Sequence, residues 1–177
     1  MTELSNIANI AEIVGAVIVI GGLFFAILQM RLIKQQRREL AAIELFRFFG
    51  NPKFAHAYKT ILHLPDGMSA QQIKSADAQL EDAAMLIGTT MENIGVMTHQ
   101  RIVPFKIVNN LLGTSTIVLW SKLENWTVSL REELDNPSAF EWFQWLSERL
   151  EERKHLQTGP AYETERNWRP ANPQYRL

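Results

Sequence analysis

The sequence contains no cysteine. This absence excludes disulfide bonds, thiolate metal sites and cysteine nucleophiles, and it suits a reducing compartment. The chain carries 18 basic and 19 acidic side chains, so no excess of positive charge points to nucleic acid as a partner. Helix packing is therefore expected to supply the stability of the protein.

Catalytic and metal-binding motifs are also missing. Neither glycine-rich pattern that binds nucleotide phosphates occurs, and the Gly-x-Ser-x-Gly pattern of serine hydrolases is absent. His56 and His63 stand about two helical turns apart, whereas two histidines that share a metal on one helix are three or four residues apart. The sequence therefore predicts no metal, no cofactor and no catalytic residue.

One long apolar run lies near the N-terminus. Ile13 to Leu28 includes no polar side chain, and the uncharged stretch continues to Met30, between Glu12 and Arg31. At ~1.5 Å per residue this stretch spans about 27 Å, close to the ~30 Å hydrocarbon core of a bilayer. The run predicts a transmembrane helix over residues 7–30, after an N-terminal extension at residues 1–6.

Two other interpretations of this run are open. A core helix of a globular protein is one of them, but such a helix is seldom apolar on every face. A cleaved signal peptide is the other, but it begins with basic residues, whereas Glu3 and Glu12 precede the run. Glu12 itself marks the outer interface or acts as an intramembrane acid.

Four basic residues follow the run, with no acid among them: Arg31, Lys34, Arg37 and Arg38. By the positive-inside rule this basic collar places the N-terminus outside and residues 31–177 in the cytoplasm. The collar either fixes the orientation alone or also binds anionic lipid headgroups.

Small residues form a stripe along the predicted span: Ala11, Gly15, Gly22 and Ala26. Small side chains let two helices approach closely in lipid, so the stripe predicts self-association of the span. Glycine and alanine are also common in membrane helices that do not pair.

The remainder of the chain predicts helices, since no alternation typical of strands persists. Residues 31–49 continue the span as a juxtamembrane helix, and residues 50–156 form a bundle of five or six helices. Asn51-Pro52 and Asn136-Pro137 each read as an N-cap followed by a first-turn proline. A capping box at Ser69 opens a helix that reaches about Gln100. Residues 157–177 are polar and rich in proline, which predicts a disordered tail.

Two further helices are expected, one from Pro104 to Gly113 and one over residues 115–134. The core-facing stripe of the helix before them is expected at three- and four-residue steps: Leu80, Ala83, Ala84, Ile87, Met91, Ile94 and Met97. The aromatic residues of the last helix serve either the core or a partner.

A polar group stands beside this apolar stripe. Glu92 and Asn93 precede Gly95, and Trp120 and Arg131 lie on a later helix. A partly buried carboxylate needs a partner, and the Arg131 guanidinium can bind it through two hydrogen bonds. We expect a polar clamp between helices here, or alternatively a ligand or partner site, with Gly95 allowing a second helix to come close.

The same residues carry a resemblance to a known family. The runs MENIGVMTHQRIVPF, LLG, LWSKLENW, LREEL and DNPSAFEWFQWLSERL, with ELFRFFGNPKFAHAYKTIL upstream, are similar to an uncharacterised bacterial family catalogued as a domain of unknown function. The likeness covers roughly residues 10–155. It implies a single N-terminal span followed by a small helical domain, with Glu92, Gly95, Trp120 and Arg131 at positions where the family's residues cluster. It implies no activity.

These observations favour an all-α protein of the bacterial inner (plasma) membrane that acts by binding, either to itself or to another membrane or cytoplasmic protein. An oligomeric channel or membrane-active effector, with Glu12 at the pore mouth, is a second hypothesis. A membrane-tethered enzyme is a third, and it requires Glu92 and Arg131 to line an open cleft.

Overall fold

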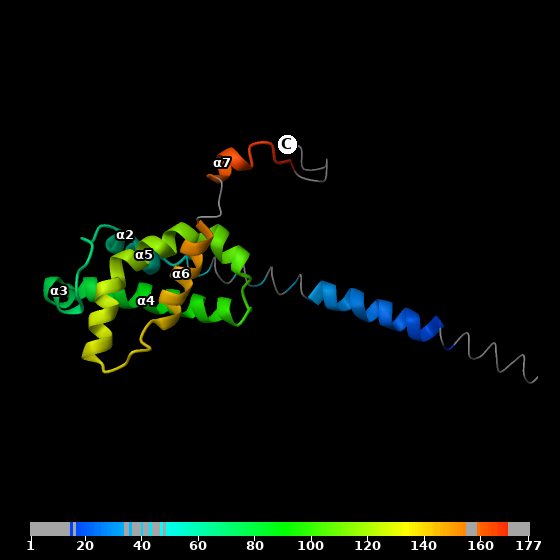
Figure 1. The fold of residues 1–177 in the computed structure, drawn as a ribbon, viewed down its shortest axis with the longest axis horizontal. Helices are drawn as coiled ribbons and strands as arrows, with labels where there is room; N and C mark the ends of the chain where they lie inside the picture. The colour runs from blue at the N-terminus through cyan, green and yellow to red at the C-terminus, as the bar shows by residue number, and fades with distance from the viewer. Residues whose placement is uncertain are drawn as a thin grey trace, which may run out of the picture. The chain divides into compact units, whose positions relative to one another are not determined.

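The computed structural model describes residues 15, 17–33, 36, 40, 43, 47, 49–154 and 159–169. Within these residues the chain is helical and has no strand, so the all-α prediction is confirmed. The chain divides into two compact units, residues 1–47 and residues 48–177, and each unit is described by itself (Figure 1).

In the first unit, residues 17–33 form one uninterrupted helix whose side chains are all exposed. Residues 36, 40, 43 and 47 are also helical and exposed. No helix in the described part of the chain combines the length and the apolarity of a membrane-crossing helix. The N-terminal extension, Ala11 and Glu12 of the expected span, and Lys34, Arg37 and Arg38 of the basic collar lie outside the described residues.

The second unit contains the bundle. Its helices are α2 (Pro52–Leu62), α3 (Ala70–Ala76), α4 (Ala78–His99), α5 (Phe105–Glu133), α6 (Glu141–Lys154) and the short α7 (Ala161–Thr164). The expected start of α2 is confirmed: the Asn51 side chain accepts a hydrogen bond from the Lys53 N–H at 2.9 Å, and Pro52 occupies the first turn. The capping box of Ser69 with Gln72 is also confirmed at the start of α3.

The single helix expected after Ser69 is two helices. Asp77 is extended (φ −164°, ψ 134°), and its carboxylate accepts a hydrogen bond from the Gln79 N–H at 2.9 Å as the N-cap of α4. A residue that caps the next helix cannot continue the previous one, so the chain turns sharply between α3 and α4.

The two helices expected around Gly113 are one, because α5 continues through Gly113 for 29 residues. Gly113 is buried and lies near the Leu150 side chain of α6, so it serves the packing of two helices and does not end one. The last helix begins later than expected. Asn136 accepts a hydrogen bond from the Ser138 N–H at 3.2 Å, which forms a turn, and α6 starts only at Glu141.

Helix α4 lies at the centre of the bundle and packs against α2, α3, α5 and α6, while α6 lies across α4 and α5 (Figure 1). Most of the expected stripe on α4 is buried, although Leu80 and Met97 are only half-buried. The largest fully buried side chains are Trp126, Phe143, Ile61, Ile73, Ile87, Met91, Ile94, Leu119, Leu123, Leu146 and Leu150. Leu134, directly after the last residue of α5, is 59% exposed.

One row of polar side chains on α5 holds the loop between α2 and α3. Lys122 donates to the Leu64 carbonyl at 2.8 Å, and Asn125 donates to the Gly67 carbonyl at 3.1 Å. One turn further, the Ser129 hydroxyl accepts a hydrogen bond from the Ala70 N–H at 2.6 Å. The three residues follow each other at three- and four-residue steps, so they share one face of α5.

The segment expected to be a disordered tail includes α7, a single helical turn whose residues are exposed. The other described residues of this tail lie between 159 and 169, and residues 157, 158 and 170–177 are outside the described part.

Candidate functional site

The polar residue with the most distinctive surroundings is Glu92 on α4. Its carboxylate accepts a hydrogen bond from the Phe143 N–H at 2.8 Å, and the Trp142 N–H forms a second one. Both donors belong to the first turn of α6, where backbone N–H groups have no partner within the helix. Glu92 therefore caps α6 from a different helix, and the negative charge suits the positive end of the helix dipole.

Two glycines of α4 make this cap possible. A Cβ atom on Gly95 would lie 2.7 Å from the carbonyl carbon of Trp142 and closer still to its oxygen. A Cβ atom on Gly88, two turns earlier, would lie 2.9 Å from the Phe140 ring. The expectation that Gly95 allows a helix to come close is confirmed, and the approaching helix is α6.

Arg131 does not bind Glu92, so the expected two-bond pairing is wrong. Its guanidinium instead donates to the Ala139 carbonyl at 2.8 Å and to the Gln144 side-chain oxygen at 2.8 Å. Arg131 thus holds the turn before α6, while Glu92 holds the first turn of the helix. Backbone N–H groups of α6, and not a side chain, satisfy the carboxylate.

Burial raises the pKa of Glu92 above its ordinary value of 4.5. The hydrogen bonds from the backbone of Phe143 and Trp142 lower the pKa, the negative charge of Glu141 raises it and the charge of Arg131 lowers it. Loss of hydration is the largest of these effects, so the proton is held more tightly than in an exposed glutamate.

The other two residues of the expected clamp have different surroundings. Trp120 is half-buried, and its ring contacts the Phe143 ring edge-on with centroids 5.1 Å apart. Asn93 is exposed. The structure thus brings Glu92, Trp120 and Arg131 together around the start of α6 and leaves Asn93 at the surface.

A second aromatic group lies at the surface beside this region. The centroid of the Trp142 ring lies 4.4 Å from that of the His99 ring and 5.9 Å from that of the Trp145 ring. The His99 and Trp145 ring centroids are 5.5 Å apart. His99 is exposed and both tryptophans are half-buried, whereas Phe143, Leu146 and Leu150 of the same helix are buried. The aromatic residues of α6 are therefore divided between the core and this surface cluster.

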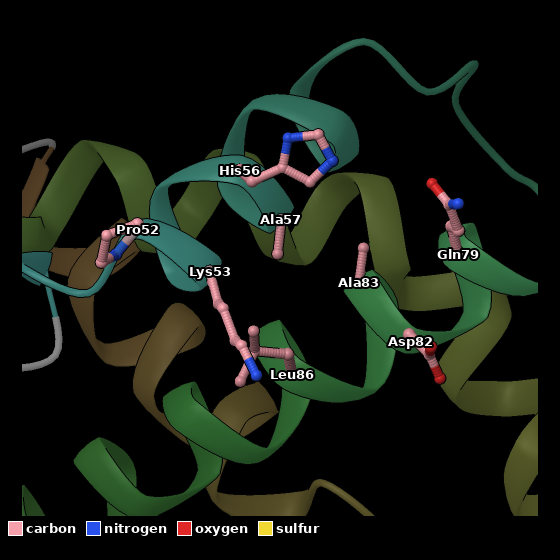
Figure 2. A pocket seen from close by; sticks show the side chains of 8 residues that line it. All are labelled: Pro52, Lys53, His56, Ala57, Gln79, Asp82, Ala83 and Leu86. Carbon is pink, nitrogen blue, oxygen red and sulfur yellow. The ribbon is translucent and has the colours of Figure 1, made fainter.

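A groove of about 460 Å³ lies between α2 and α4. Figure 2 shows the small side chains of Ala57 and Ala83 standing between the two helices, with the polar groups of Lys53, His56 and Asp82 around them. Within the described residues, no three side chains of His, Asp or Glu lie together as a metal site.

The predicted site residues in the first unit are all exposed where they are described. A Cβ atom on Gly15 or Gly22 would meet no atom within 4 Å, and Ala26 and Arg31 are exposed on the same helical segment. The side chains of this segment thus remain available to a lipid or protein neighbour outside the described chain.

The sequence matches one family over residues 16–150, under the description "Domain of unknown function (DUF4760)". The chain belongs to this family. The match spans most of the chain, from the N-terminal helix to α6, and leaves α7 outside. No curated protein and no solved structure is significantly similar to the sequence.

The DUF4760 match thus includes every residue of the α6 cap and both walls of the groove. Sequence reasoning missed Gly88, although its distance of two helical turns from Gly95 was a usable signal. It also missed the groove, because two buried alanines and scattered charges on two helices carry no pattern of their own.

Proposed function

We propose that this DUF4760 protein is a membrane-anchored binding protein. Its N-terminal helix lies in the bilayer, and its helical bundle binds a protein partner or a second copy of the chain. The proposal assigns no catalytic residue.

The observation that carries the proposal is the exposure of apolar side chains all around residues 17–33. Leu23 is 62% exposed, Phe24 64% and Phe25 61%, and these consecutive residues point to different sides of one helix, about 100° apart. Burial of one such side chain contributes ~1.5–3 kcal/mol, so transfer of the whole segment into lipid contributes roughly 10 kcal/mol or more. A bilayer covers every face of a helix at once, which a single groove on a protein cannot do.

The orientation rests on the basic collar. Arg31 follows the apolar segment directly, and Lys34, Arg37 and Arg38 follow it in the sequence. The proposed arrangement has the N-terminus outside and the bundle in the cytoplasm, at the inner membrane of a bacterium.

The geometry around Glu92 supports binding over catalysis. The enzyme hypothesis needed Glu92 and Arg131 at an open cleft, but both bind groups of the segment from Ala139 to Gln144. Their polar groups hold helix α6 in place. The half-buried Trp142 and Trp145 offer instead the kind of aromatic surface that dominates many protein interfaces.

The anchor is tested by separating membranes from supernatant after an alkaline wash. The double variant Ile20→Lys, Phe24→Lys places two charges in the apolar segment, each costing ~2.5–3.5 kcal/mol at the centre of a bilayer. We expect the wild-type chain in the pellet and this variant largely in the supernatant.

The matched control makes the same chemical change in the bundle. Ile102 is 56% exposed and Leu134 59%, so Ile102→Lys, Leu134→Lys adds two charges without touching the segment. This control is expected in the pellet. A wild-type chain in the supernatant, or equal behaviour of the two variants, would exclude the anchor.

The binding role is tested by crosslinking in native membranes followed by affinity purification. We expect a specific crosslinked product that weakens in Trp145→Ala, with an unchanged thermal melt of the bundle. Monomer alone, with no co-purifying protein, contradicts the role.

A further inference from the structure

Nine residues of the N-terminal unit follow one another at steps that alternate strictly between four and three, which is the spacing of one helical face. We call this set the heptad stripe, and its members are Gly15, Val19, Gly22, Ala26, Gln29, Ile33, Gln36, Leu40 and Ile43. Each is helical and exposed. An average step of 3.5 residues is the repeat of helices that wind around one another in a left-handed coil.

We propose that the heptad stripe is the interface of a parallel homodimer, in which two copies of the chain pair from Gly15 to Ile43. This inference rests on the proposed membrane anchor, because the bilayer gives every copy the same orientation and so presents identical stripes in register.

The composition of the stripe changes along its length in the way such a pair requires. Gly22 and Ala26 are small, and small residues let two backbones approach closely where lipid surrounds them. Further along, Ile33 is 47% exposed, Leu40 65% and Ile43 57%. Branched aliphatic side chains at these positions fill the spaces between residues of a facing helix in water.

The polar members of the stripe identify the occupant as a second copy. Gln29 is the only polar residue between Val17 and Met30, and no described residue forms a hydrogen bond with its side chain. Gln29 lies at the end of the proposed span, where packing an amide against another helix without a hydrogen-bond partner costs about 1–3 kcal/mol. An identical amide across a parallel interface offers both a donor and an acceptor, so Gln29 pairs with Gln29 and Gln36 with Gln36.

Arg31, the first charged residue after the apolar segment, lies off this face. Arg31 lies two residues before Ile33, which places it about 200° around the helix from that residue. The Arg31 side chains of two copies therefore stay on the outer sides of the pair, where headgroups and water reach them.

The chain has no cysteine, so in a single-cysteine variant of the full chain the introduced residue is the only one that can form a disulfide. Ala26→Cys, Ile33→Cys and Leu40→Cys lie on the stripe, and Leu28→Cys and Arg31→Cys lie off it. Since a disulfide needs Cβ atoms ~3.5–4.5 Å apart, oxidation in membranes should give about fivefold more dimer on the stripe than off it.

A second measurement tests the polar layer. Gln29→Leu keeps the segment apolar but removes the amide, so the dimer fraction in detergent or membranes should fall about threefold. Met30→Leu, one residue further and off the stripe, should leave the dimer fraction unchanged.

The outcomes separate this inference from the proposed anchor. A chain that remains in washed membranes but crosslinks equally on and off the stripe overturns the homodimer and leaves the anchor standing. A product whose mass is not twice that of the chain also overturns it, in favour of a different partner. A wild-type chain found in the supernatant of alkaline-washed membranes overturns the anchor itself.

Discussion

Replacement of Gly95 by alanine tests the close contact between α4 and α6. The new Cβ atom would lie 2.7 Å from the Trp142 carbonyl carbon and 2.9 Å from the Trp142 Cβ. Two of the atoms that it meets are backbone, so no rotation of a side chain relieves the overlap, and the start of α6 has to move away.

Two costs and one gain determine the expected change in stability. Overpacking of a core costs typically ~1–3 kcal/mol. The movement also lengthens the 2.8 Å bond from the Phe143 N–H to Glu92, and a hydrogen bond to a charged group contributes ~1.5–3 kcal/mol. Alanine returns about 1 kcal/mol of helix propensity. The net destabilisation is about 2–4 kcal/mol, or roughly 8–16 °C in Tm for a bundle of this size.

Gly113→Ala is the matched control. Gly113 is also a buried glycine inside a helix, but its nearest atom would be the Asn109 side-chain oxygen at 3.4 Å, an ordinary contact. This variant should be unchanged or more stable by up to about 1 kcal/mol. Thermal unfolding of the full chain in detergent, followed by circular dichroism, measures both. Equal stability of the two variants would refute the argument from close approach.

Three further predictions concern single interactions. Because burial raises the Glu92 pKa, the folded chain retains a proton that the unfolded chain releases above about pH 4.5. The unfolding free energy of the wild type relative to Glu92→Gln should therefore fall as the pH rises above that value. Denaturant titrations at several pH values measure this difference, and a constant difference would contradict the prediction. Lys122→Met should destabilise by about 1–2 kcal/mol through loss of the bond to the Leu64 carbonyl. Lys122 also forms a 2.6 Å ion pair with the exposed Asp66, and Asp66→Asn should cost under about 0.5 kcal/mol in the same titration. Asp135 follows α5 in a left-handed conformation (φ 47°), so Asp135→Gly should raise stability by about 0.5–1 kcal/mol, and a lower Tm would contradict this account.

Local chemistry made the starts of α2 and α3 predictable. An asparagine or serine whose side chain binds the next N–H groups forms its contacts within a few residues, so the sequence alone is sufficient. The same chemistry misplaced α6, because Asn136 forms its turn without starting the helix. Phe140 takes a left-handed conformation (φ 54°) with its ring against Trp126, and only then can α6 begin.

Tertiary contacts account for the remaining differences. Nothing near Gly113 in the sequence indicates that Leu150 packs beside it, so the glycine resembled a helix end. Glu92 needed a partner, as expected, but the sequence cannot show that the end of another helix presents free N–H groups there. Asp77 lies between two alanines in a region of good helix formers, and its capping bond decides against one continuous helix.

The loop between α2 and α3 is held by residues that come some 58 positions later in the chain. During translation the loop is synthesised first, and Lys122, Asn125 and Ser129 are synthesised only afterwards. During synthesis the carbonyls of Leu64 and Gly67 thus remain bound to water until most of α5 has emerged. Truncated nascent chains that end before Lys122 should therefore leave this loop open to proteases, while chains extended well past Ser129 should protect it.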